Sequence, residues 1–156
     1  MKNDLAVGDR APSFAVVTDN AGKISSAALK GKAYVLYFYP KDDTSGCTKE
    51  AIAFSENKRK FDALGVEIIG VSKDTTQSHE KFRTKHKLKI ALGSDPDKEL
   101  AETYGVWVEK SLYGRTYMGM DRATFLVDAK GIIRQVWRKV RVPGHVEAVL
   151  AAAKSL

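Results

Sequence analysis

Residues 37–50 read Tyr37-Phe38-Tyr39-Pro40-Lys41-Asp42-Asp43-Thr44-Ser45-Gly46-Cys47-Thr48-Lys49-Glu50, and they join a predicted strand to a predicted helix. The run from Ala33 to Tyr39 is short, apolar and aromatic without alternation, which indicates a buried central strand. After Cys47, one helical face is apolar and carries Ala51, Phe54, Phe61 and Leu64. Gly65 ends this pattern as a C′ glycine. The loop between strand and helix has the Pro, Asp, Ser and Gly residues of a turn.

Cys47 is the only cysteine of the chain, and the pattern places it in the first turn of the helix, on the inward face. Unpaired N–H groups give a helix start a partial positive charge, which favours a thiolate over a thiol. Because the thiolate is the form that attacks, this position favours a reactive cysteine. The alternative is an inert core residue, since a lone cysteine often behaves as a small buried hydrophobe. Position alone leaves both interpretations open.

Length and composition bound the class of protein. The 156 residues predict a single domain spanning 1–156, and an apolar content of 44% is enough to fill its core. No window approaches the roughly 18 apolar residues of a membrane span. The start, Met1-Lys2-Asn3-Asp4-Leu5, lacks the apolar run of a signal peptide, so we expect a cytoplasmic protein with no membrane partner. One cysteine excludes an intrachain disulfide and a cysteine-cluster metal site.

The remaining segments alternate between strand and helix patterns. We expect strands over 11–17, 66–72, 88–92, 122–127 and 132–142, and helices over 74–87, 95–104 and 146–154. A turn is expected over 18–23, and a hairpin pairs 106–108 with 116–118. The strand–helix–strand unit over 33–72 implies parallel pairing. This order predicts an α/β protein of thioredoxin-like fold, with a central mixed sheet flanked by helices and an N-terminal β extension.

The sequence gives no support for a cofactor, a metal site or a nucleic-acid partner. The chain has no glycine-rich phosphate loop and no C-x-x-C pair, so we expect no cofactor. His79 and His86 lie seven residues apart on a Lys- and Arg-rich helix, where we expect solvated side chains and not metal ligands. A basic edge on the last strand carries Arg134, Arg138, Lys139 and Arg141. We interpret it as solvated charge alternating with an inward Trp137, so neither this edge nor the net charge of +7 indicates a nucleic-acid partner.

The segment Pro40-x-x-x-Thr44-x-x-Cys47 resembles the peroxidatic signature of the peroxiredoxins. The wider run from Phe38 to Glu50 is similar to the bacterioferritin-comigratory, or Q-type, subfamily. The resemblance continues in Gly8-x-x-Ala11-Pro12-x-Phe14, in Tyr104-Gly105-Val106-Trp107 and in Gly119-x-x-Arg122-x-x-Phe125-Leu126-Val127-Asp128-x-x-Gly131. Two positions depart from it. Ser45 stands where the family usually has proline, and Ile52 stands where many Q-type members carry a resolving cysteine.

The resemblance implies a thiol-dependent peroxidase and a role for each site residue. Cys47 would attack hydrogen peroxide or an organic hydroperoxide and become a sulfenic acid. Arg122 maps to the active-site arginine, which stabilises the thiolate and donates to peroxide, although a surface ion pair is the alternative. Thr44 would hydrogen-bond the peroxide, and Pro40 would shield the sulfur from water. Glu50 either orients Arg122 or only favours the helix dipole.

Resolution must then come from outside the chain, because there is no second cysteine. Thioredoxin, glutaredoxin and low-molecular-weight thiols are all candidates for the external thiol reductant. We expect a monomer or a weak dimer. An alternative is a peroxide-sensing or chaperone-like protein on the same fold without multiple turnover. Two others are a binding module that uses the basic strand, and a Cys–His hydrolase with His79, His86 or His145 as base.

Overall fold

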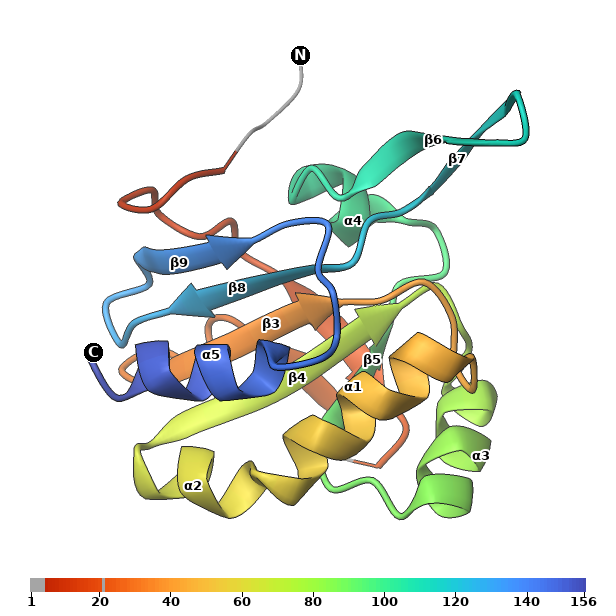
Figure 1. Ribbon diagram of the computed structural model, residues 1–156. Coiled ribbons are helices and arrows are strands. Elements are labelled where there is room, and N and C mark those ends of the chain that lie inside the picture. The colour runs from red at the N-terminus through yellow and green to blue at the C-terminus, as the bar shows by residue number, and fades with distance from the viewer. Residues whose placement is uncertain (1–4, 21) are drawn as a thin grey trace.

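A computed structural model describes residues 5–20 and 22–156 (Figure 1). The expectation drawn from the first residues of the chain therefore falls, apart from Leu5, outside the described part, as does Ala21 of the predicted turn. Within the described ranges, no helix combines the length and the apolar character that a membrane crossing requires.

In the described part of the chain, seven strands form the main sheet, in the order β2-β1-β5-β4-β3-β8-β9. The central strand β3 (Ala33–Phe38) runs parallel to β4 (Val66–Ser72) and antiparallel to β8 (Ala123–Val127). β4 is parallel to β5 (Ala91–Ser94), and the hairpin of β1 (Ala15–Thr18) and β2 (Lys23–Ser25) extends that edge. β9 (Ile133–Trp137) closes the other edge. The predicted mixed sheet with an N-terminal β extension is confirmed.

Helices cover the sheet and close two apolar cores. α1 (Ser45–Glu56), α2 (Lys58–Ala63) and α5 (His145–Ala153) lie across one face (Figure 1). α3 (Thr76–His86) packs beside them, and α4 (Glu99–Thr103) contributes to the other core. Because side chains alternate along β3, Val35 and Tyr37 enter the first core while Leu36 and Phe38 enter the second. The unbroken apolar run of β3 is explained by burial on both faces.

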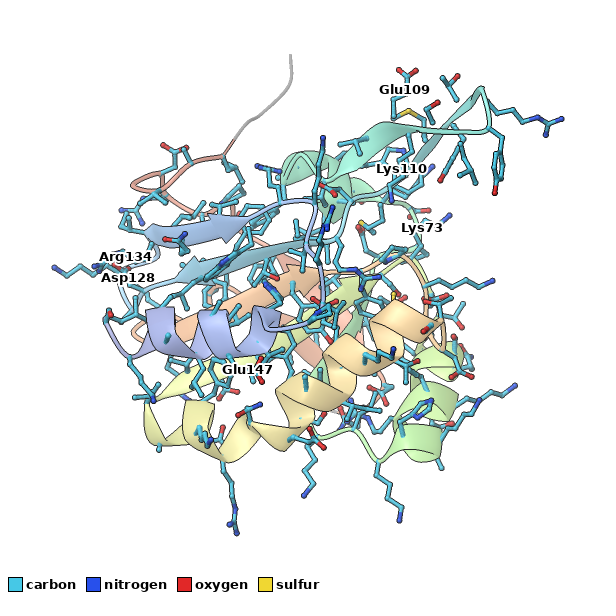
Figure 2. All side chains as sticks on the ribbon, in the orientation of Figure 1. Lys73, Glu109, Lys110, Asp128, Arg134 and Glu147 are labelled. Carbon is cyan, nitrogen blue, oxygen red and sulfur yellow. The ribbon has the colours of Figure 1, made fainter. Side chains whose placement is uncertain are left out.

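A second, two-stranded sheet stands apart from the main one. The predicted hairpin is confirmed as β6 (Trp107–Leu112) paired with β7 (Arg115–Met120). Tyr113 and Gly114 form its turn, both with positive φ. Figure 2 shows Glu109 and Lys110 on this hairpin, at the other end of the molecule from Asp128 and Arg134.

Several predicted element bounds are wrong. The helix expected from Cys47 to Leu64 breaks at Asn57, because the Asn57 side chain donates to the carbonyl of Ala53 at 2.8 Å and competes with the helical bonds. The last strand ends at Trp137 and not at Val142. The helix expected from residue 95 begins only at Glu99, and the strand expected over 88–92 lies at 91–94.

The basic edge of the last strand is only partly as predicted. Trp137 faces inward and packs edge-on against His145, with ring centroids 5.6 Å apart. Arg134 is exposed and pairs with Asp128 at 3.3 Å (Figure 2). Arg138, however, is half-buried and lies over the ring of Phe125 at 5.5 Å. The prediction of solvated charge is therefore wrong for Arg138, since its guanidinium covers apolar surface.

Candidate active site

The carboxyl end of β3 leads through a short loop into α1, as the sequence predicts. Thr44 is the N-cap residue, with extended backbone, and its carbonyl accepts from the N–H of Thr48 at 2.8 Å. Its side chain does not cap the helix, because its hydroxyl donates to the carbonyl of Lys41 at 2.9 Å. Cys47 follows in the first turn and is only 1% exposed. The predicted placement of Cys47 on the inward face of a helix start is confirmed.

Arg122 lies immediately before β8 and bridges two residues of α1. Its Nη2 donates to the Cys47 Sγ at 3.4 Å, and its Nη1 donates to the Glu50 Oε1 at 2.8 Å. Cys47 and Glu50 are three residues apart, so both project from the same side of α1. The structure thus brings together three of the five residues singled out in the sequence, and the other two, Pro40 and Thr44, belong to the loop that leads to them.

Gly46 makes the close approach of Arg122 feasible. A side chain at this position would place its Cβ 3.0 Å from the Arg122 Nη2. The backbone of Arg122 is fixed as well, because its carbonyl accepts from the N–H of Val140 at 3.0 Å. The segment after β9 therefore fixes the backbone of Arg122, while its guanidinium contacts the first turn of α1.

The carboxylate of Glu50 is fully buried. Burial raises its pKa to about 7, against the opposing charge and hydrogen bond of Arg122. Its second oxygen, Oε2, has no hydrogen-bond partner within the described residues, and the Nε2 of His145 lies 3.9 Å away. Burial and the charge of Arg122 lower the pKa of His145 to about 4, so this ring is neutral at pH 7. Arg122 is the charged partner of Glu50.

Glu50→Gln tests the buried carboxyl through stability. A carboxyl whose pKa is raised on folding stabilises the protein fully below its unfolded value of 4.5, and this contribution is lost as the pH rises through about 7. The free energy of unfolding of the wild type should therefore fall by about 3 kcal/mol relative to that of Glu50→Gln between pH 4.5 and 8. Urea unfolding across this range measures the difference, and a difference independent of pH would contradict the assignment.

His79 is the clearest error of the sequence prediction, which treats it as solvated. It is fully buried, and its Nδ1 contacts the Asp42 Oδ2 at 2.7 Å while its Nε2 contacts the Gly93 carbonyl at 2.9 Å. His86 is nearer to the prediction, being partly exposed and 2.9 Å from Asp43. The signal that could have identified these contacts is the consecutive pair of aspartates in the loop before Cys47.

No group of three or more His, Cys, Asp or Glu side chains is arranged to hold a metal ion in residues 5–20 and 22–156. The Cys–His hydrolase alternative has no geometric support either. Among the described contacts of Cys47, the hydrogen-bonding partner is the guanidinium of Arg122. His79 and His86 hydrogen-bond to loop aspartates, and His145 contacts Thr124 at 2.8 Å.

The chain is similar to known proteins over nearly its whole length. Residues 7–136 match the AhpC/TSA family. Peroxiredoxin Bcp of Bacillus subtilis is 41% identical over 152 residues, which cover 97% of each chain. Peroxiredoxin Bcp of Escherichia coli is 36% identical over 148 residues, which cover 95% of each chain.

Solved structures agree with the sequence relatives. Xanthomonas campestris peroxiredoxin Q superposes with a TM-score of 0.87 at 40% identity, over 91% of this chain and 90% of that one. A cysteine-to-serine mutant of Xylella fastidiosa PrxQ superposes with a TM-score of 0.92 at 31% identity, over 98% of both chains. These superpositions confirm the predicted thioredoxin-like fold. The chain belongs to the AhpC/TSA family and, within it, to the Bcp/PrxQ peroxiredoxins, which are thiol-dependent peroxidases.

Proposed function

We propose that the Cys47 thiolate attacks the terminal oxygen of a peroxide and that Arg122 stabilises both the thiolate and the departing oxygen. The new S–O bond forms as the O–O bond breaks, and the leaving oxygen takes up a proton to become water or an alcohol. Cys47 becomes a sulfenic acid. The observation that carries this proposal is the 3.4 Å contact between the Arg122 Nη2 and the Cys47 Sγ. The Xanthomonas campestris relative reduces alkyl peroxides, which supports organic hydroperoxides as substrates beside hydrogen peroxide.

The remaining site residues have positioning and polar roles in this proposal. The Thr44 hydroxyl already donates to the carbonyl of Lys41, so its free lone pair is the group that accepts the O–H of a peroxide. Pro40 begins the loop and, with no N–H to solvate, shields the approach to Cys47. Glu50 orients Arg122 through Nη1, which leaves Nη2 free for sulfur and peroxide.

The reductant is proposed to be an external thiol, because Cys47 is the only cysteine. Its attack on the sulfenic acid gives a mixed disulfide and water, and a second thiol then releases Cys47 as a thiol. Thioredoxin, glutaredoxin and small thiols all fit this chemistry. We propose that residues 1–156 act as one domain, in the cytoplasm, as a monomer or weak dimer. The continuous seven-stranded sheet with its two cores supports the single domain.

Turnover tests the proposed function. With a thiol reductant in excess, each protein molecule should consume many equivalents of hydrogen peroxide. Consumption of one equivalent, with Cys47 left oxidised in the presence of every reductant class, would favour the alternative of a peroxide sensor. Intact-mass measurement with and without a thiol trap after one equivalent identifies the oxidised species.

The oxidised protein should keep α1 folded and hold Cys47 as a sulfenic acid until an external thiol arrives. Ile52, at the position of the resolving cysteine in two-cysteine relatives, is about 140° around the helix from Cys47. Because residue 52 is an isoleucine, unwinding of the helix would not be compensated by formation of a disulfide. Its side chain is partly buried and packs against the first core, which also favours the folded helix. Amide hydrogen exchange over residues 47–56 should therefore be the same before and after oxidation.

A disulfide-linked dimer through Cys47 as the main oxidised product on non-reducing gels would contradict this prediction. A sharp rise in exchange on oxidation would contradict it as well. Ile52→Cys is the complementary variant, because it gains an internal disulfide only if α1 can unwind, since disulfide formation requires the two Cα atoms within about 7 Å. Persistent sulfenic acid also predicts overoxidation by excess peroxide, which mass spectrometry detects.

A further inference from the structure

The loop before Cys47 is fastened to α3 by a cluster of buried polar side chains. Asp42 is the centre of this cluster. Its Oδ1 accepts from the Tyr39 hydroxyl at 2.6 Å, and its Oδ2 accepts from the Ser78 hydroxyl at 2.8 Å and contacts the His79 Nδ1 at 2.7 Å. The side chains of Asp42 and His79 are 4% and 0% exposed. None of these groups belongs to the site around Cys47.

The partners of His79 determine its protonation. The carbonyl of Gly93 can only accept a hydrogen bond, so the Nε2 that contacts it at 2.9 Å carries a proton. The carboxylate of Asp42 accepts from the Tyr39 and Ser78 hydroxyls, and a carboxylate can only accept from the Nδ1 as well. The Nδ1 then carries a proton too. His79 is an imidazolium that donates from both ring nitrogens.

The charged groups around His79 agree with this protonation. Asp42 faces it from the loop and Asp74 from the end of β4, while Tyr39 approaches it from the end of β3. Burial opposes the charge, but the hydrogen bond and charge of Asp42, with the Gly93 bond and the charge of Asp74, raise the pKa of His79 above its usual value. These charges and hydrogen bonds therefore favour the imidazolium over the neutral ring.

Two consecutive aspartates of the loop contact α3 or the segment just before it. The N–H of Asp42 donates to the Asp74 Oδ2 at 2.8 Å, so the backbone is held as well as the side chain. Asp43 has a left-handed φ of 60° and contacts Lys85 at 2.7 Å and His86 at 2.9 Å. Aspartate adopts the left-handed conformation more readily than most residues, and the contacts of Asp43 are exposed, so the buried contacts of Asp42 hold the loop more firmly than those of Asp43.

We propose that His79 is a positioning residue for peroxide reduction: its imidazolium locks Asp42, and with it the loop that presents Thr44 and the N-terminus of α1 to the peroxide. This proposal rests on the proposed function of Cys47. His79 acts through Asp42 and touches neither sulfur nor substrate. Misplacement of a polar group by about 1 Å can reduce a reaction rate by as much as a hundredfold. Loss of the contact between His79 and Asp42 should therefore slow the oxidation of Cys47.

The first test is spectroscopic and independent of activity. In the ¹⁵N-labelled protein at pH 7, both ring nitrogens of His79 should give the chemical shifts of protonated nitrogens. In Asp42→Asn, the amide can donate to Nδ1, so a neutral ring keeps both of its contacts and one nitrogen should become unprotonated. A neutral His79 ring in the wild type would overturn the proposal, whatever the outcome for the function of Cys47.

The second test is kinetic and uses the second-order rate constant for oxidation of Cys47 by hydrogen peroxide. His79→Gln should lower it about tenfold, while Asp42→Asn, which keeps the hydrogen bonds without the charge, should lower it only about threefold. His86→Gln is the matched control on the same helix, because it removes the exposed contact to the next aspartate, and its rate should stay within about twofold of wild type.

An unchanged rate in a folded His79→Gln protein would overturn the positioning role while leaving the function of Cys47 intact. If His79→Gln does not fold, Asp42→Asn decides through its pH profile. The wild-type rate should decline at alkaline pH as His79 loses its proton, and Asp42→Asn should lack that decline. Identical profiles of wild type and Asp42→Asn would overturn the proposal.

Discussion

Replacement of Cys47 by serine should abolish peroxide reduction and leave the fold intact. A serine hydroxyl does not ionise near neutral pH and cannot form a sulfenic acid. Because Cys47 is the only cysteine of the chain, no other thiol can take over the reaction. The side chain is 1% exposed and is replaced by one of similar size, so the loss of unfolding free energy should be about 1 kcal/mol. Peroxide consumption in the presence of a thiol reductant measures the first effect, and thermal unfolding measures the second.

The matched control places the same hydroxyl elsewhere on α1. Ala53→Ser lies six residues along the helix and is partly buried, but it has no contact with Arg122 or Cys47 among the described hydrogen bonds. It should keep wild-type turnover. If Cys47→Ser reduced peroxide at a rate near that of the control, the proposed mechanism would be wrong, because the reaction would not pass through the sulfur.

The sequence predicts the parts of this fold that depend on local periodicity. The apolar run of β3, the inward face of α1 and the glycine after α2 are all readable from residues a few positions apart. Phe54 and Phe61 are both buried, as their spacing from Cys47 predicts. The pairing of β3 with β4 follows from the length of the intervening helical segment, since a parallel connection needs a crossover.

The errors occur where a hydrogen bond or contact outside the apolar pattern decides the structure. His79 lies on a helix rich in Lys and Arg, so the pattern indicates a solvated face, yet its partner Asp42 is 37 residues earlier in the chain. The break at Asn57 arises because its side chain competes for a helical carbonyl, which apolar periodicity does not register. β9 ends at Trp137 because the chain then turns: Lys139 has a left-handed φ of 49°, and the N–H of Val140 donates to the carbonyl of Arg122.

In the candidate site, too, helical geometry predicts the nearby residues but not the distant ones. The sequence places Cys47 at a helix start and Glu50 on the same side of the helix, because both positions follow from helical geometry. Arg122, by contrast, is 75 residues from Cys47, and it was identified only through the resemblance to a family. The contact of His145 with the Glu50 pair was not predicted at all, since it depends on how α5 crosses α1.

Arg122→Lys should slow the reaction of Cys47 with hydrogen peroxide by more than about tenfold, which corresponds to about 1.4 kcal/mol in the barrier. Lysine keeps the positive charge but loses the planar fork that donates to the Glu50 Oε1 at 2.8 Å and to the Cys47 Sγ at 3.4 Å at once. Glu50 is fully buried, and among the described residues its Oε2 has no hydrogen-bond partner, so the single ammonium should be drawn to the carboxylate and away from sulfur.

Two measurements separate this loss from a general disturbance of the fold. The rate of Cys47 alkylation by iodoacetamide at neutral pH reports the thiolate directly and should fall together with the peroxide rate. Arg138→Lys is the matched control, because Arg138 is also half-buried but stacks on Phe125 and donates to the carbonyl of Gly105. Its peroxide rate should remain within about twofold of wild type. If Cys47 were alkylated at the same rate in Arg122→Lys as in this control, the proposed role of Arg122 would be wrong. Replacement of a guanidinium that stabilises the thiolate should lower the fraction of thiolate, and with it the alkylation rate.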